Sequence, residues 1–179
     1  ASTFTAMLWE QGVEHEAAAL ARMGVTADLS QVPLVEREAA TLAAMARKEP
    51  LIYRGRLTVD DLVGEPDLLE LQSNEGYAPG DIKSGKGIEG GDEETEDRLK
   101  KHYAVQLALY TDILGRKGMS AGRTPFVWDV NREEVVYPLD EPQGQRNPRT
   151  LWQVYEGTLA IARNIVSQTV ETRAAYGGP

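Results

Sequence analysis

The segment GEPDLLELQSNEGYAPGDIKSG, residues 64–85, holds two short apolar runs separated by the turn signal NEG at 74–76. This pattern predicts two adjacent antiparallel strands, one opening at Asp67 and the other running through Asp81 to Lys83. Residues two apart in a strand project from the same face, so Asp81 and Lys83 are expected to point together. Neighbouring strands lie about 5 Å apart, which allows Asp67 and Asp81 to converge, although periodicity does not fix their register.

These three side chains suit one kind of chemistry. Carboxylates are hard oxygen ligands for Mg²⁺ or Mn²⁺, which take one or two protein carboxylates together with water and substrate phosphate. An ammonium group beside the metal can orient the attacking water and offset charge that grows on the phosphate. Asp67, Asp81 and Lys83 therefore predict metal-dependent phosphodiester hydrolysis. The alternatives are a harmless Asp81–Lys83 surface pair, a turn role for Asp67, and a metal ligand at Asp60 or Asp61.

Composition describes a soluble globular chain. The 179 residues suffice for one domain with a core, and 41% are hydrophobic and 26% charged. Cysteine is absent, which excludes disulfides, thiolate zinc sites and iron–sulfur clusters within this stretch. No apolar run approaches membrane-spanning length, so we expect a cytoplasmic protein without a membrane partner. The net charge of -9 weighs against nucleic acid as a partner, but local patches decide such binding.

The remaining pattern alternates between helical and extended segments. Predicted helices cover residues 5–23, 36–48, 92–115 and 150–176, and predicted strands cover residues 51–57, 124–130 and 133–139. Residues 24–33, 85–91 and 141–148 are predicted as turns or loops, and the inward stripe of the third helix as Leu99, Tyr103, Leu107, Tyr110 and Leu114. The sum is a mixed α/β domain around a small sheet. It divides into a helical part at 1–49, a sheet with a motif helix at 50–149 and a C-terminal helix at 150–176, and we expect a fragment of a longer chain.

Three motifs carry a resemblance to a known family. GEPDLLEL and YAPGDIKSG, in the segment 64–85, resemble the core motif of the PD-(D/E)xK nuclease superfamily. KHYAVQLALYTDIL, from Lys101, is similar to the Q-x-x-x-Y helix of its RecB-type branch, and WEQGVEHE at 9–16 resembles the G-x-x-H element of that branch. The matches fall between residues 12 and 110 in the order found in the family.

The resemblance implies a restriction-endonuclease-like core with a small mixed sheet flanked by helices. The implied site residues are His15, Asp67, Asp81, Ile82 through its carbonyl oxygen, Lys83, Gln106 and Tyr110. The first four would hold the metal, the lysine would position water, and the last two would orient the lysine or contact DNA. Taken alone, His15 also fits an ordinary, partly exposed helix histidine.

The implied function is that of a Mg²⁺- or Mn²⁺-dependent DNA nuclease. Exonuclease-like action on single-stranded DNA or free ends, in DNA repair, recombination or defence, would suit the RecB-type branch, as would a helicase or repair protein as partner. The alternative is a non-catalytic DNA-binding or scaffolding module that retains the nuclease fold.

Overall fold

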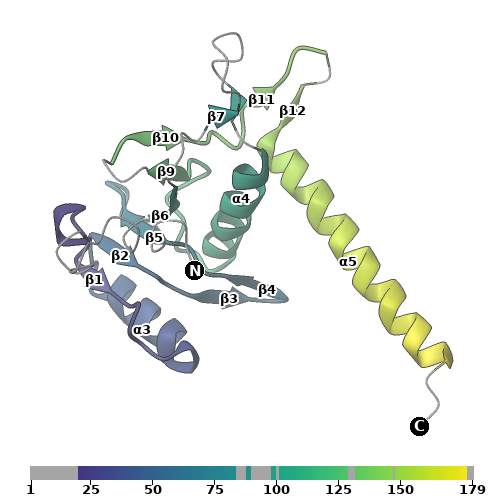
Figure 1. The fold of residues 1–179 in the computed structure, drawn as a ribbon, viewed down its shortest axis with the longest axis horizontal. Helices are drawn as coiled ribbons and strands as arrows, with labels where there is room; N and C mark the ends of the chain where they lie inside the picture. Colours follow the sequence, from purple (N-terminus) through teal and green to yellow (C-terminus); the bar gives the residue numbers. More distant parts are fainter. Residues whose placement is uncertain are drawn as a thin grey trace, which may run out of the picture.

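The computed structural model of the chain describes residues 20–83, 88–89, 98–99, 101–128, 132–146 and 148–176. Its centre is a six-stranded mixed sheet, β1-β2-β5-β6-β9-β10 (Figure 1). The strands are β1 (Ala27–Asp28), β2 (Leu51–Tyr53), β5 (Leu68–Leu71), β6 (Tyr77–Ile82), β9 (Phe126–Trp128) and β10 (Glu134–Val136). The pairs β1–β2 and β6–β9 are parallel and the other three are antiparallel, so the predicted mixed α/β class is confirmed.

The long helices of the described residues are α3 (Leu34–Ala46), α4 (Lys101–Arg116) and α5 (Leu151–Tyr176). The predicted helix at 36–48 is confirmed as α3, which begins directly after Pro33. Proline is tolerated there because the first N–H groups of a helix have no intrahelical partner. Of the helix predicted at 5–23, Leu20–Arg22 are helical and residues 5–19 lie outside the described residues.

The two faces of the sheet carry separate parts of the core because strand residues alternate between faces. On one face, Leu68, Ile82 and Phe126 pack with Leu20 and Met23. The opposite face packs against α3 and α4, through side chains that include Ile52, Leu69, Tyr77, Met45, Ile113 and Leu114. The site residues therefore have to be assigned to one of these two faces.

One glycine in β6 is required by close packing. A Cβ atom added at Gly80 would lie 2.2 Å from Cε2 of Phe126 on the neighbouring strand. The aromatic ring thus occupies the space that any other side chain at this position would need. Glycine here lets β9 pack tightly beside the strand that carries Asp81.

Two predicted elements are corrected. The segment 51–57 is not one strand: β2 ends at Tyr53, and Arg54 has a φ of 62° in the left-handed region before β3 (Leu57–Val59) begins. Strand β3 forms a hairpin with β4 (Leu62–Gly64). The turn-rich segment 24–33 includes the short strand β1, which pairs with β2.

The helix predicted at 92–115 begins later than expected. Within the described residues it runs over Lys101–Arg116, and Leu99 belongs to β8 (Arg98–Leu99), which pairs with β7 (Ile88–Glu89). Placing Leu99 on the helix stripe was therefore wrong, because a strand of two residues is too short to show a periodicity in the sequence. Residue 92, the expected first helical position, lies outside the described residues. The expected loop at 141–148 likewise includes β11 (Pro142–Gln143), paired with β12 (Arg149–Thr150).

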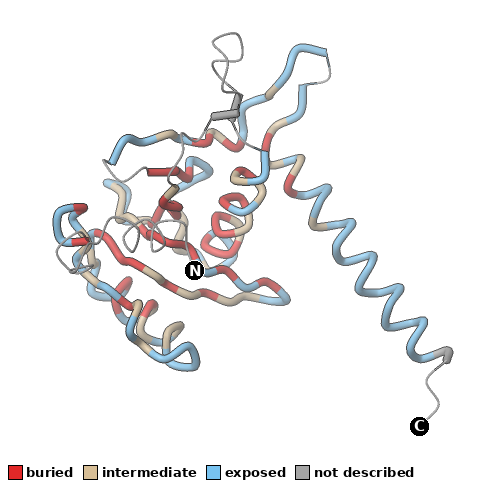
Figure 2. The backbone as a smooth tube through the Cα atoms, viewed as in Figure 1, coloured by how far each residue is buried: buried red, intermediate tan, exposed pale blue. Residues whose placement is uncertain are grey.

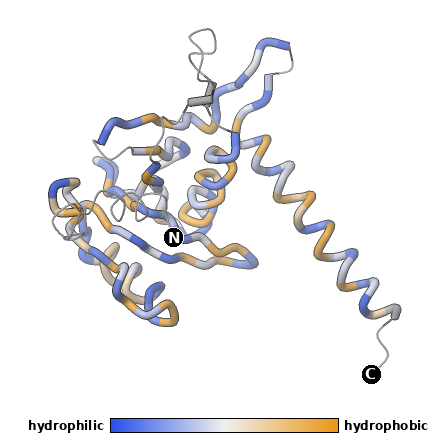
Figure 3. The backbone as a smooth tube through the Cα atoms, in the orientation of Figure 1, coloured by the Kyte–Doolittle hydropathy of each residue, from blue (hydrophilic) through white to orange (hydrophobic). Residues whose placement is uncertain are grey.

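Helix α5 leaves the body of the molecule after its first turns (Figures 1 and 2). Leu151 and Tyr155 are buried against α4, and the Arg163 guanidinium pairs with Asp61 of the β3–β4 turn at 2.7 Å. Apolar residues continue along the helix (Figure 3), but Ile165 is 58% exposed. Among the described helices, none combines the length and the apolar character needed to cross a bilayer.

Candidate active site

The register of β5 and β6 places the two predicted carboxylates opposite each other. Leu68 pairs with Gly80, so the next pair along the ladder is Asp67 with Asp81. Directly opposite residues in an antiparallel pair have Cβ atoms about 5 Å apart. The structure therefore supplies the convergence that the sequence left open.

Both carboxylates are buried and tied to backbone groups. Asp67 is 7% exposed and Asp81 is 2% exposed. The Ile82 N–H donates to Oδ2 of Asp67 at 2.9 Å, and the Asp67 N–H makes a longer contact of 3.4 Å with Oδ1 of Asp81. These bonds hold the two side chains on the face of the sheet that also carries Leu69 and packs on α4.

Burial raises the pKa of both groups, and the charge of Asp67 adds to the rise at Asp81. Removal from water, followed by the negative charge of Asp67, raises the pKa of Asp81 to about 7. Burial also raises the pKa of Asp67, opposed by its hydrogen bond from Ile82 and by the charges of Lys83 and Arg54. A pair of carboxylates that resists full ionisation is a receptive place for a positive charge.

A fully buried oxygen of the pair lacks a hydrogen bond within the part of the chain that the structure describes. Oδ2 of Asp81 is buried and, among the described residues, has no hydrogen-bond partner. Leaving such an oxygen unpaired is unfavourable, and a cation is one group that would satisfy it. The donor chemistry of this pair fits Mg²⁺ or Mn²⁺.

The backbone offers a third oxygen. The N–H and C=O of a strand residue point to the same neighbour, so the Ile82 carbonyl is directed toward the side on which its N–H reaches Asp67. The β5–β6 ladder ends at Leu68 and Gly80, and its register continued by two residues would set Pro66 against Ile82. Because proline has no N–H, it cannot donate to that carbonyl.

Lys83 lies on the same side of the sheet as the two acids. It follows β6 directly, and its N–H donates to the Trp128 carbonyl at 2.8 Å, which continues the parallel ladder. Its Nζ lies 5.1 Å from the ring centroid of Tyr103 on α4. The positive charge of Lys83 counteracts part of the rise in the pKa of both aspartates, so Lys83 acts electrostatically on both carboxylates.

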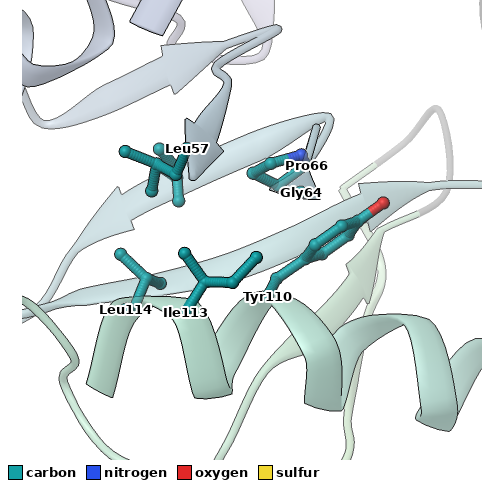
Figure 4. Close-up of a pocket in the computed structure, with 7 residues that line it drawn as sticks. Leu57, Gly64, Pro66, Tyr110, Ile113 and Leu114 are labelled. Atoms are coloured by element: carbon teal, nitrogen blue, oxygen red, sulfur yellow. The ribbon is translucent and has the colours of Figure 1, made fainter. Parts of the chain in front are cut away.

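Gln106 and Tyr110 form the predicted pair on one face of α4. Nε2 of Gln106 donates to the Tyr110 hydroxyl at 2.6 Å. In Figure 4 the Tyr110 ring lies beside Pro66 and Ile113, and its hydroxyl points away from this apolar cluster. Burial, then the charge of Asp81, raises the pKa of Tyr110, so its hydroxyl stays protonated and can donate. The helix thus brings a neutral donor toward the carboxylates.

The alternative ligands Asp60 and Asp61 are not brought to the carboxylate pair. His15 lies outside the described residues. Asp60 and Asp61 occupy the β3–β4 turn and pair with Arg116 and Arg163, at 2.9 Å and 2.7 Å. Among the described residues, no group of three or more His, Asp or Glu side chains is arranged to hold a metal.

A groove lies elsewhere, between the β3–β4 hairpin and α5. It has a volume of about 520 Å³ and is lined by Leu62 and Asp61 of the hairpin and by Leu159, Ala162 and Arg163 of α5. The predicted site residues that the structure describes do not line this groove. Buried charge and strand register define the candidate site.

Sequence reasoning missed Arg54, which the fold brings next to Asp67. Nη1 of Arg54 lies 3.8 Å from Oδ1 of Asp67. The only hint in the sequence is a basic residue directly after an apolar strand, and such residues are common. Its proximity depends on the register of β2 with β5, which periodicity does not give.

Neither a protein-family model nor a curated protein matches this chain. Family membership therefore stays a prediction made from the motifs.

Proposed function

We propose that the chain is a Mg²⁺- or Mn²⁺-dependent DNA nuclease with a restriction-endonuclease-like core of the RecB type. The observation that carries this proposal is the opposed, buried pair Asp67 and Asp81 with Lys83 on the same face of the sheet. The Q-x-x-x-Y pair on α4, joined by a hydrogen bond, adds support. The proposed substrate is single-stranded DNA or duplex DNA with free ends.

Each residue has a role that its surroundings support. Asp67, Asp81 and the Ile82 carbonyl would hold the cation, and His15 is proposed as a further ligand from its motif alone. When bound, the metal would polarise the phosphodiester and lower the pKa of an attacking water. Lys83 donates a hydrogen bond that orients this water and offsets negative charge on the phosphate.

The protein's own groups also control the proton and the water. The raised pKa of Asp81 lets its carboxyl hold a proton near neutral pH until a cation displaces it. Tyr110, held by Gln106, is a neutral donor able to orient Lys83 or a DNA phosphate. Both aspartates are buried, so their carboxylates have little contact with bulk water.

A cleavage assay tests the proposal. Labelled single-stranded and duplex oligonucleotides are incubated with the protein in Mg²⁺, Mn²⁺ or EDTA. We expect metal-dependent cleavage that Asp81→Asn and Lys83→Ala reduce by at least about 100-fold, since each removes a group used in the transition state. Asp140→Asn is the matched control, because its side chain is 67% exposed and pairs with Arg123. No cleavage by the wild type in Mn²⁺, or undiminished cleavage by Asp81→Asn, would refute the proposal.

A second candidate is a non-catalytic DNA-binding module. It is favoured by the lack of a three-residue metal cluster among the described residues. Tight DNA binding that is indifferent to metal, without any cleavage, would support this candidate over the nuclease.

A further inference from the structure

Arg54 sits where β2 ends, directly beside the first carboxylate of the candidate site. Strands β2 and β5 pair Tyr53 with Leu68, so Arg54 is opposite Asp67 in the continued register. The Arg54 N–H donates to the Asp67 carbonyl at 2.9 Å, which fixes the backbone of one against the other. The left-handed φ of 62° at Arg54 turns the chain out of the strand at this residue.

The Arg54 guanidinium is positioned between the buried carboxylate and solvent. Its side chain is 33% exposed, whereas that of Asp67 is 10% exposed. The separation of 3.8 Å between Nη1 and Oδ1 exceeds the N–H···O hydrogen-bond range, so the attraction is electrostatic. A guanidinium has five N–H donors in a fork that matches two phosphate oxygens, and within the described residues no hydrogen bond occupies those of Arg54.

The charge balance of the site shows what such a group would do. With both carboxylates ionised, Asp67 and Asp81 carry two negative charges, and Lys83 and Arg54 carry two positive charges. A divalent cation would raise the sum to two positive charges, which favours an anionic phosphodiester. Without Arg54, the site with its cation bound would carry a net charge of only one positive unit.

We infer that Arg54 is a substrate-binding residue that contacts a phosphate of the DNA strand at the candidate site. This inference rests on the proposed function and extends it by naming a residue that holds the substrate. Arginine suits the role better than lysine because its planar fork binds phosphate oxygens bidentately.

Arg56 provides a matched control on the same connection between β2 and β3. Its guanidinium pairs with Glu65 rather than with Asp67. Removing its charge changes the net charge of the chain by the same amount as removing that of Arg54. A general electrostatic effect would therefore weaken DNA binding equally in Arg54→Gln and Arg56→Gln. Loss of a phosphate contact at the site would weaken binding in Arg54→Gln alone.

The test measures DNA binding apart from cleavage. Fluorescence anisotropy of a labelled single-stranded oligodeoxynucleotide is recorded in Mg²⁺ with the Lys83→Ala protein, over a series of salt concentrations. In that background we expect Arg54→Gln to weaken binding by about 10- to 100-fold, the range of a charge-assisted contact. We also expect it to reduce the slope of log K against log salt by about 0.7, the value for one phosphate contact to a single strand. Arg54→Lys is expected to keep the slope and lose several-fold in affinity.

Each outcome decides the inference. A role limited to neutralising Asp67 would leave the salt slope of Arg54→Gln unchanged, and that result overturns the inference, as does an equal loss in Arg56→Gln. If Arg54→Gln fails to fold, an Arg54→Lys protein that binds as tightly as its parent overturns it instead. Wild-type protein that cuts DNA while Arg54 variants bind normally refutes the inference alone. Wild-type protein that neither binds nor cuts DNA refutes both proposals. If the wild type binds DNA without cutting it and Arg54→Gln weakens this binding, the inference is supported for a non-catalytic DNA-binding module.

Discussion

Asp81→Asn is expected to stabilise the protein while abolishing its proposed activity. The folded state holds the pKa of Asp81 at about 7, compared with an ordinary value of 3.8. At about 1.4 kcal/mol per pKa unit, the ionised group destabilises the fold by at most about 4 kcal/mol. Asparagine keeps the shape of the side chain and removes the charge that is repelled by Asp67. For a chain of this size, a gain of about 2–4 kcal/mol raises Tm by roughly 5–15 °C.

The sign of the pH dependence makes the reasoning specific. The pKa of Asp81 is higher in the folded state than in the unfolded state. Protonated Asp81 therefore contributes its full share to the free energy of unfolding below the unfolded-state pKa, and this share is lost as pH rises toward about 7. The stability advantage of Asp81→Asn over the wild type should thus be largest near pH 8.5 and fall to about half near pH 5.5.

Calorimetric or optical melting in EDTA at both pH values measures this difference, with Asp140→Asn as the exposed control. Adding Mg²⁺ should narrow the gap between Asp81→Asn and the wild type, because a bound cation relieves the repulsion in the wild type. An asparagine variant that is no more stable than the wild type near pH 8.5, or whose advantage does not vary with pH, would refute the buried carboxylate pair.

Three further outcomes are expected. Free Mg²⁺ at about 100 times its dissociation constant should stabilise the wild type by about 2.7 kcal/mol. The measurement is a rise in Tm that EDTA reverses, and an unchanged Tm in both Mg²⁺ and Mn²⁺ argues against a metal site. Gly80→Ala should lower the free energy of unfolding, measured in urea, by about 1–3 kcal/mol, because its Cβ would lie 2.2 Å from the Phe126 ring. Gly115→Ala, whose Cβ would meet no atom within 4 Å, should raise the free energy of unfolding by about 0.5–1 kcal/mol. Leu114→Ala, at a fully buried position, should cost about 2–5 kcal/mol, and Ile165→Ala, at a position 58% exposed, less than about 1 kcal/mol; equal losses in urea melts would contradict the observed burial.

The sequence predicted the sheet hairpin and most of the helices because their signals are local. Alternation of apolar residues on either side of the turn at 74–76 indicated β5 and β6, and apolar periodicity indicated α3 and α5. The start of α4 was misplaced because β7 and β8 have two residues each and are too short to show an apolar alternation. The break in the strand after Tyr53 was missed because Arg54 has a left-handed backbone conformation, which arginine rarely adopts.

By itself, the sequence determined which chemical groups are present and how they are spaced along each element. Asp81 and Lys83 had to share a face because strand side chains alternate, and Gln106 and Tyr110 had to be neighbours because they are one helical turn apart. Only the tertiary structure decided that Asp67 stands opposite Asp81, and that Arg54 stands beside Asp67. Register and burial arise from pairing between strands, and a shift of one residue would have turned these carboxylates to the other face of the sheet.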